Sequence, residues 1–346
     1  MLTEKMNADR FIISPKTLVF GTTYQCTATC KNCCFGCNPK ITNRLSLEEM
    51  KEYLDQALLY FANSLKVLVL TGGEPFLLKD DLTQIVEYGS SKGLVTRIVS
   101  NGFWATSYEE AYEILLNLRK HGLKEINFST GDEHQKWVSY ENIVNSCRAS
   151  MDLGLTCFVN VEVHDNCEFN GDAFRNDSRL KPYFDATKYK IPLKIERGIW
   201  IPFSEDSNIS YNNMETKEDL NKKRCESLFT TLPINPYSQL MSCCGLPSER
   251  IVPMRLGNLR DNTIKELFEL QFQDFLKIWL FVDGPYTVLK YLYEKRGIEK
   301  KIIGHLCYVC AEIFKDNENV KYVQEHYEEI MPSVMFKYMM LKPALE

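Results

Sequence analysis

The sequence has no apolar run long enough to cross a membrane, and Met1 to Ser14 lack the apolar centre of a signal peptide. It also has no repeat and no low-complexity tract. The 41 basic and 46 acidic residues give a net charge of only −5, which is not the pattern of a nucleic-acid-binding protein. We therefore expect a cytoplasmic protein, without membrane or nucleic-acid partners, that acts on a peptide or a small molecule.

Cysteine, by contrast, is abundant, with 13 residues in a chain of 346. In a reducing compartment such cysteines are more often metal ligands or reactive thiols than disulfides. The length predicts one large domain and a smaller module. We expect a lead-in at 1–16, a barrel domain at 17–204, a linker or substrate loop at 205–222, a cysteine-containing module at 223–315, and a helical tail at 316–346 that packs against the barrel.

The first part of the chain alternates apolar, β-branched segments with amphipathic helical segments. Strands are predicted at Thr17–Thr22, Lys66–Thr71, Thr96–Ser100, Lys124–Ser129, Thr156–Val163 and Leu193–Phe203. Helix signals lie between them, namely the capping-box pairs Ser46/Glu49 and Ser107/Glu110 and the C-terminal glycines Gly122 and Gly154. This order predicts an α/β fold with a parallel sheet that curls into a full or partial barrel. The active site should then lie at the carboxyl ends of the strands.

The loop that follows the first predicted strand holds Cys26, Cys30 and Cys33. Three thiolates on one short loop would bind three irons of a cubane and leave the fourth iron open to a second molecule. Cys34 and Cys37 lie beside them. The two Cys-x2-Cys pairs, Cys30 to Cys33 and Cys34 to Cys37, would alternatively supply four ligands to a zinc ion.

The Cys-x3-Cys-x2-Cys motif after a first strand resembles the signature of the radical S-adenosylmethionine (SAM) superfamily. The resemblance implies a partial (β/α)6 barrel and a [4Fe-4S] cluster that binds SAM. It also implies reductive cleavage of SAM to a 5′-deoxyadenosyl radical, which abstracts hydrogen from a substrate. The chain departs from the pattern at Asn32, where relatives often have an aromatic residue. Phe35 would then supply the packing near the adenine.

Polar or glycine-rich residues follow the later predicted strands. Gly72-Gly73-Glu74-Pro75 ends the second strand and resembles the family motif that holds the amino group of the cofactor. Alone, it would be read as a tight turn with a solvated Glu. By the same resemblance we expect further cofactor contacts from Ser100, Asn101, Ser129 and Asp132. His134 would either face the pocket as a catalytic residue or make a hydrogen bond at a helix start.

A second cysteine group lies in the C-terminal part of the chain. Cys225 and Cys243 are separated by 17 residues, and Cys307 and Cys310 form a Cys-x2-Cys pair. With the Leu256–Leu259 stretch, this spacing resembles the twitch form of a SPASM domain, which implies that the four cysteines bind an auxiliary [4Fe-4S] cluster. A structural zinc site is the alternative. Cys244 would replace Cys243 as a ligand, stay inert, or donate a hydrogen atom from its thiol.

Relatives with such a module either modify ribosomally made peptides or oxidise alcohols. We favour peptide modification, by epimerisation or by a thioether or carbon–carbon crosslink, because the polar 205–222 segment suits an extended substrate. The alternatives are a dehydrogenase acting on an alcohol and a non-catalytic zinc-binding module. A low-potential electron donor such as flavodoxin or ferredoxin is implied, and the peptide would be recognised either by a separate protein or by the barrel itself.

Overall fold

The computed structural model describes residues 12–201, 209–211, 223–246, 248–299, 302 and 305–342. This part of the chain contains a nine-stranded sheet in the order β6-β5-β4-β3-β2-β1-β7-β8-β9. The first six strands run parallel and lie side by side in sequence order. Their bounds are β1 (Thr17–Thr23), β2 (Val67–Gly72), β3 (Val95–Ser100), β4 (Leu123–Thr130), β5 (Thr156–Val163) and β6 (Lys194–Ile199).

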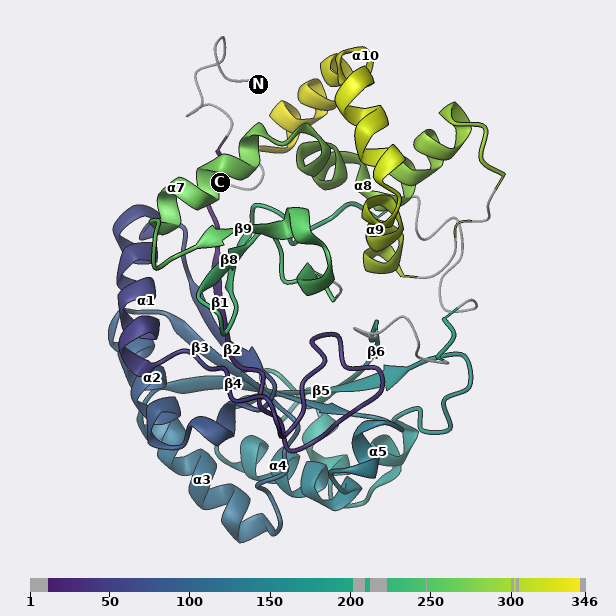
Figure 1. Ribbon diagram of the computed structural model, residues 1–346. Helices are drawn as coiled ribbons and strands as arrows, with labels where there is room; N and C mark the ends of the chain where they lie inside the picture. The colour runs from purple at the N-terminus through teal and green to yellow at the C-terminus, as the bar shows by residue number, and fades with distance from the viewer. Residues whose placement is uncertain are drawn as a thin grey trace.

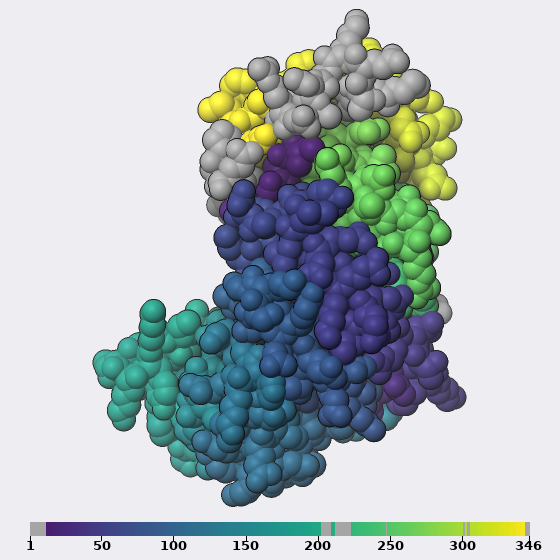
Figure 2. All heavy atoms as spheres, turned by 90° about the vertical axis from the view of Figure 1, so that its left-hand side faces the viewer, coloured from purple at the N-terminus to yellow at the C-terminus, as the bar shows by residue number. Residues whose placement is uncertain are grey.

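Helices follow the strands and cover the outer face of the curved sheet (Figure 1). They are α1 (Leu47–Phe61), α2 (Asp80–Ser91), α3 (Tyr108–Lys120), α4 (Tyr140–Asp152) and α5 (Asp172–Asn176). The strands and helices bury one continuous apolar core, because each strand places its β-branched and leucine side chains against the helices. Figure 2 shows this side of the molecule, where the purple and blue residues of the first part of the chain lie below the green and yellow residues of the C-terminal part. The predicted α/β fold with a mostly parallel sheet is confirmed.

Short 3-10 helices complete the element list, at Pro75–Leu78, His134–Lys136, Lys181–Phe184, Ser248–Arg250, Val252–Met254 and Gln271–Gln273. Most strand predictions are right to within one or two residues, but β6 is shorter at its carboxyl end than expected. The Ser46/Glu49 capping box makes both of its reciprocal bonds. The Ser107/Glu110 prediction is only half right: Ser107 accepts from the Glu110 amide at 3.1 Å, whereas the Glu110 carboxylate accepts from the hydroxyl of Thr106.

The C-terminal part extends the same sheet. Strand β7 (Thr231–Ile234) pairs in parallel with β1, and β8 (Gln239–Met241) and β9 (Arg255–Asn258) add antiparallel strands. The helices are α7 (Ile264–Leu270), α8 (Phe275–Lys295), α9 (Leu306–Lys315) and α10 (Asn317–Leu341). Helices α8, α9 and α10 build most of a second apolar core, to which Ile13, Phe229 and Met241 of β8 also contribute. No helix in the described part of the chain is long and apolar enough to span a membrane.

Two predictions for this part need correction. The sequence also predicts one helix at roughly Thr263–Ile278. This is wrong, because α7 ends at Leu270 and Asp274 starts α8 by accepting a hydrogen bond from the Lys277 amide at 3.3 Å. The tail is helical as predicted, but α10 packs on α8 and α9 and not on the barrel (Figure 1). The predicted loop at 205–222 lies outside the described residues except for 209–211.

Candidate functional site

The first cysteine loop leaves the carboxyl end of β1 and closes on itself. The amide of Cys26 donates to the carbonyl of Asn38 at 3.2 Å, so the two ends of the loop meet. Cys26, Cys30 and Cys33 are half-buried, whereas Cys34 and Cys37 are buried. The three predicted ligands therefore lie on one closed loop at the carboxyl end of the sheet, where barrel enzymes bind substrates.

The cysteine loop is held against β2 by main-chain bonds that need glycine. The amide of Gly73 donates to the Thr23 carbonyl at 2.6 Å, and the amide of Glu74 donates to the Gln25 carbonyl at 2.9 Å. A Cβ atom at Gly73 would lie 2.1 Å from the Gln25 carbonyl oxygen. At Gly72, where φ is 136°, it would lie 2.3 Å from the Thr23 oxygen. In this structure the two glycines permit the close approach of the cysteine loop; their contact with a cofactor stays a prediction.

Glu74 is fully buried and links the ends of β2 and β3. One carboxylate oxygen accepts from the Phe76 amide at 3.1 Å and the Ser100 hydroxyl at 2.9 Å, and the other accepts from the Asn101 amide at 2.8 Å. Burial raises the pKa of Glu74 to about 7, although these hydrogen bonds act in the opposite direction. Glu74 and Ser100 thus form a hydrogen bond with each other, and their contact with the cofactor stays a prediction.

Asn101 touches the cysteine loop directly. Its side-chain amide donates to the Thr27 hydroxyl at 3.0 Å and lies 3.6 Å from the sulfur of Cys26. The backbone amide of Ala28 also lies 3.4 Å from that sulfur. Hydrogen-bond donors of this kind favour a thiolate, whereas burial raises the pKa of Cys26 to about 12. Asn101 is therefore brought to the first cysteine group, and its contact with the cofactor stays a prediction.

The residues predicted after β4 have separate surroundings. Ser129 is buried. Asp132 accepts from the backbone amides of Glu168 at 2.8 Å and Phe169 at 2.9 Å, so its carboxylate holds the loop that follows β5. His134 is buried, and its Nδ1 lies 2.7 Å from the carboxylate of Glu162. The reading of His134 as a hydrogen-bonding residue at a helix start accords with this contact and with its place in the 3-10 helix His134–Lys136.

Sequence reasoning missed Glu162, which lies near the carboxyl end of β5 and is 1% exposed. Its carboxylate accepts from the side-chain amide of Asn32 in the cysteine loop at 2.7 Å. Burial raises the pKa of Glu162, but the hydrogen bonds from His134 and Asn32 outweigh burial and leave the pKa below its usual value. The available signal was an acidic residue in a mostly apolar strand, because a buried carboxylate needs partners.

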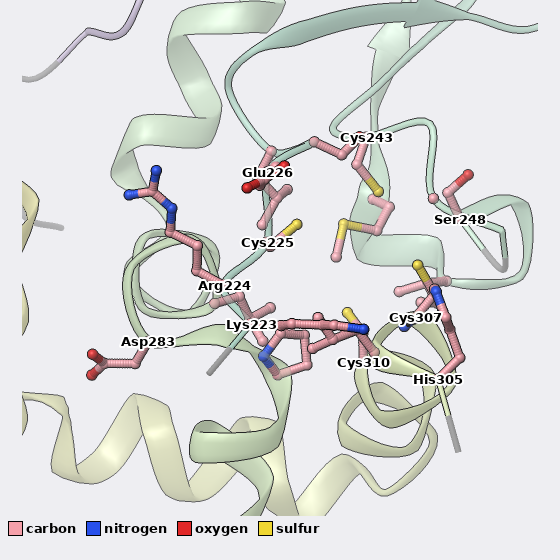
Figure 3. Close-up of a pocket in the computed structure, with 18 of the residues that line it drawn as sticks. Lys223, Arg224, Cys225, Glu226, Cys243, Ser248, Asp283, His305, Cys307 and Cys310 are labelled. Carbon is pink, nitrogen blue, oxygen red and sulfur yellow. Dashed lines mark hydrogen bonds between the residues drawn. The ribbon is translucent and has the colours of Figure 1, made fainter. Parts of the chain in front are cut away.

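The second cysteine group surrounds one cavity of about 730 Å³. Cys225 precedes β7, Cys243 follows β8, and Cys307 and Cys310 lie on one face of α9. Figure 3 shows their four sulfur atoms directed toward a common space. A Cβ atom built on Gly245 would lie 3.4 Å from the sulfurs of both Cys243 and Cys307. The structure therefore brings together the four cysteines that the sequence grouped, from three separate segments.

Cys244 differs from these four cysteines. Its side chain is exposed and does not line the cavity, and its sulfur lies 3.1 Å from the hydroxyl of Ser227. Its neighbour Cys243 is buried and does line the cavity. Of the two adjacent cysteines, the geometry therefore favours Cys243 as the ligand and leaves Cys244 as an accessible thiol.

A buried polar contact joins the two cysteine regions. The phenol of Tyr24 donates to the carboxylate of Glu249, and the side-chain amide of Asn235 lies 3.2 Å from the same carboxylate. The ring of Tyr24 stacks on Phe35 with centroids 5.7 Å apart. Because Tyr24 is close to Cys26 in sequence and Glu249 is close to Cys243, this contact fixes one cysteine region against the other.

The two cysteine groups differ in their number of thiols and in their surroundings. In the parts of the chain that the structure describes, no three His, Cys, Asp or Glu side chains form a group that could hold one metal ion. All 13 cysteines are free thiols. A cubane has its irons at separate corners, so its cysteine sulfurs stand farther apart than the ligands of one zinc ion. The donor set of three and four thiols, with a roomy cavity at the second group, fits iron–sulfur clusters.

The chain is similar to known proteins both in sequence and in fold. Residues 21–164 match the sequence profile of the Radical SAM superfamily. Over 328 residues the chain is 23% identical to the "Putative peptide biosynthesis protein YydG" of Bacillus subtilis (strain 168), covering 91% of this chain and 97% of that protein. The solved structure "Native anSMEcpe with bound AdoMet" has a TM-score of 0.50 at 15% identity, covering 92% of this chain and 100% of that one. "Native anSMEcpe with bound AdoMet and Cp18Cys peptide" has a TM-score of 0.50 at 14% identity, covering 92% of this chain and 99% of that one. These two structures share the fold.

Glu74 predicts a specific pH dependence of stability. Its pKa is about 7 in the folded chain against 4.5 when exposed, so the folded chain binds the proton more tightly. The contribution of Glu74 to the free energy of unfolding should therefore fall as the pH rises from 4.5 to about 7, and then level off. Thermal unfolding midpoints of the metal-free chain across this range should show the decline, and Glu74→Gln should remove that part of it.

Glu49→Gln is the matched control, because the pKa of Glu49 shifts the other way. Burial raises this pKa, but hydrogen bonds from the Ser46 amide, Arg260 and Ser238 lower it more. Glu49 therefore stabilises the fold above its unfolded pKa, and that stability is lost as the pH falls through its folded pKa. Parallel pH profiles for the native chain and Glu74→Gln would contradict the assignment.

Proposed function

The chain belongs to the radical SAM superfamily through its residues 21–164, and on that premise we propose that it modifies a ribosomally made peptide by abstracting a hydrogen atom. The similarity to YydG carries the peptide part of this proposal, because it extends over 91% of this chain and 97% of that protein. A shared superfamily profile supports the type of chemistry, whereas an end-to-end relative named for peptide biosynthesis supports the substrate class.

Cys26, Cys30 and Cys33 would hold the SAM-binding [4Fe-4S] cluster. When bound and reduced, this cluster supplies the electron that cleaves SAM to a 5′-deoxyadenosyl radical. The protein's own part is to hold the three thiols on a closed loop, with donors such as the amide of Asn101 next to Cys26. Gly72, Gly73, Glu74, Ser100, Ser129 and Asp132 remain proposed contacts or supports of the cofactor at the neighbouring strand ends.

Cys225, Cys243, Cys307 and Cys310 would hold an auxiliary [4Fe-4S] cluster. The support is the cavity that they share and its partly apolar lining, which includes Met254. Buried thiolates without a cation are costly, and burial raises the pKa of Cys243 and Cys310. Bound iron would offset that cost by taking the place of the thiol protons. The four cysteines would thus be ligands and not spare thiols.

Cys244 is our candidate for the hydrogen donor. Its exposed thiol could give its hydrogen atom to a carbon radical on the peptide, which forms a C–H bond and leaves a thiyl radical for later reduction.

The electrons would come from flavodoxin or ferredoxin, and a reducing cytoplasm suits 13 free thiols. A separate peptide-recognition protein is part of the proposal. We place His134 as a positioning residue, since its ring is buried on Glu162.

Anaerobic reconstitution with iron and sulfide tests the two cluster assignments. The native chain should become brown, bind about eight irons as two clusters and cleave SAM when reduced with dithionite. Cys30→Ala should abolish SAM cleavage because it removes a ligand of the first cluster. Cys307→Ala should lower the iron content by about half yet leave SAM cleavage without peptide intact. A colourless protein that binds zinc stoichiometrically, or full cleavage by Cys30→Ala, would contradict the proposal.

Gly245→Ala tests the second cavity without removing a ligand. The backbone of Gly245 is not left-handed, and its added methyl would lie 3.4 Å from two sulfurs, so the metal-free fold should tolerate it. The methyl would occupy space beside both ligands, so reconstituted iron should fall toward about four per chain. Gly198→Ala is the control, because its Cβ would have one neighbour, at 3.9 Å. Equal iron content in both variants would count against an auxiliary cluster in this cavity.

The reaction itself can be read from isotope incorporation. With a candidate peptide in deuterated buffer, epimerisation through the exchanged thiol of Cys244 should add one deuterium per event, measured by mass spectrometry. Cys244→Ala should cleave SAM but lose deuterium incorporation. A peptide that loses two hydrogens without gaining deuterium would instead indicate oxidation or crosslinking. A peptide left unchanged beside an oxidised small alcohol would overturn the proposed substrate class.

A further inference from the structure

The side chain of Asn32 is held in one orientation within the cysteine loop. It lies between Cys30 and Cys33 and is 1% exposed. Its amide nitrogen donates to the Oε2 atom of Glu162 at 2.7 Å. The neighbouring amide of Lys31 donates to the carboxylate of Glu133 at 3.2 Å, so both strand ends, those of β4 and β5, hold this part of the loop.

The carboxylate of Glu162 is itself held in place by several other hydrogen bonds. Its Oε2 is also 2.7 Å from Nδ1 of His134, and its Oε1 accepts from the backbone amides of Glu133 and His134. The ring of His134 is held in turn by the edge-on ring of Trp200, with centroids 4.5 Å apart. Turning the Asn32 amide over would bring its oxygen against the Glu162 carboxylate, which is repulsive. The amide nitrogen must therefore stay on Glu162.

Because the amide nitrogen of Asn32 is held on Glu162, the direction of its carbonyl oxygen is also set. This oxygen has no hydrogen-bond partner among the described residues. This Oδ1 atom is buried, and no hydrogen-bond donor reaches it within the described residues. A buried carbonyl is strongly disfavoured when it has no donor, and most such atoms in proteins are paired. An apolar residue would fit this position without that cost, so the unpaired oxygen points to a donor from outside the described residues.

A second buried polar atom also lacks a partner. The hydroxyl of Tyr211 has no hydrogen-bond partner in the described part of the chain. Burial raises the pKa of Tyr211, and the charges of Glu162 and Cys34 add to that effect. The proposal rests on the carbonyl of Asn32, whose place in the cysteine loop is fixed by its hydrogen bond to Glu162.

We propose that the carbonyl oxygen of Asn32 accepts a hydrogen bond from the adenosyl part of SAM, and that Glu162 and His134 are positioning residues for this contact. The inference rests on the proposed function, in which Cys26, Cys30 and Cys33 hold the cluster that binds SAM. The hydrogen-bond donors of the adenosyl part of SAM are the adenine amino group and the ribose hydroxyls. Asn32, at the position where the superfamily often has an aromatic residue, would therefore contribute to cofactor affinity through a side-chain hydrogen bond.

Equilibrium binding of SAM to the reconstituted, unreduced enzyme tests the proposal without turnover. Asn32→Leu keeps the approximate volume and removes both polar atoms, so it should weaken SAM binding by about tenfold at unchanged iron content. Glu162→Gln should weaken SAM binding as well, because its amide lets the Asn32 side chain turn over. Asn145→Leu, a buried asparagine on α4 that donates to Ala105 at 3.2 Å, is the matched control and should bind SAM normally.

SAM analogues that lack the 6-amino group, the 2′-hydroxyl or the 3′-hydroxyl identify the donor. The analogue without the partner group should bind equally to the native enzyme and to Asn32→Leu, whereas the other analogues should still distinguish the two proteins. Unchanged SAM affinity in Asn32→Leu, or an equal loss for SAM and every analogue, would overturn the proposal. A native enzyme that reconstitutes but binds no SAM would instead overturn the proposed function.

Discussion

Strand β1 is the element on which both cysteine sites depend. It hydrogen-bonds to β2 along one edge and to β7 along the other, so it belongs at once to the barrel and to the C-terminal extension of the sheet. The first cysteine loop leaves its carboxyl end, and the segment with Cys225 leads into β7. A shift of β1 would therefore move the two cysteine groups relative to each other. The Tyr24–Glu249 contact fixes the same relation through side chains.

The carboxyl ends of the parallel strands are joined by buried acids. Glu74 holds β2 to β3, Glu162 holds the cysteine loop to the end of β4, and Asp132 holds the loop after β5. Each carboxylate accepts backbone amides that would otherwise be unpaired where the regular strands end. Such bonds make the rim of the barrel rigid, and a rigid rim suits chemistry in which the reacting groups must keep a fixed distance.

The architecture divides the cysteines by accessibility. Three lie half-buried on one loop, four converge on one cavity, and Cys244 is exposed beside its buried neighbour Cys243. Burial raises the pKa of Cys243 and Cys310, which supports the proposed role of the four converging thiols as cluster ligands. The exposed thiol of Cys244 is the proposed hydrogen donor. The division of roles in the proposal therefore follows from burial as much as from spacing.

Local sequence determined the order of strands and helices, the capping of α1 by Ser46, and the grouping of Cys26, Cys30 and Cys33, because these depend on residues close together in the chain. Only the tertiary structure decided that Gly73 accommodates the Gln25 carbonyl and that Glu162 reaches Asn32. Those contacts join segments from different strands and helices, and a buried hydrogen bond depends on which distant group arrives opposite it. Periodicity and spacing carry no record of that pairing.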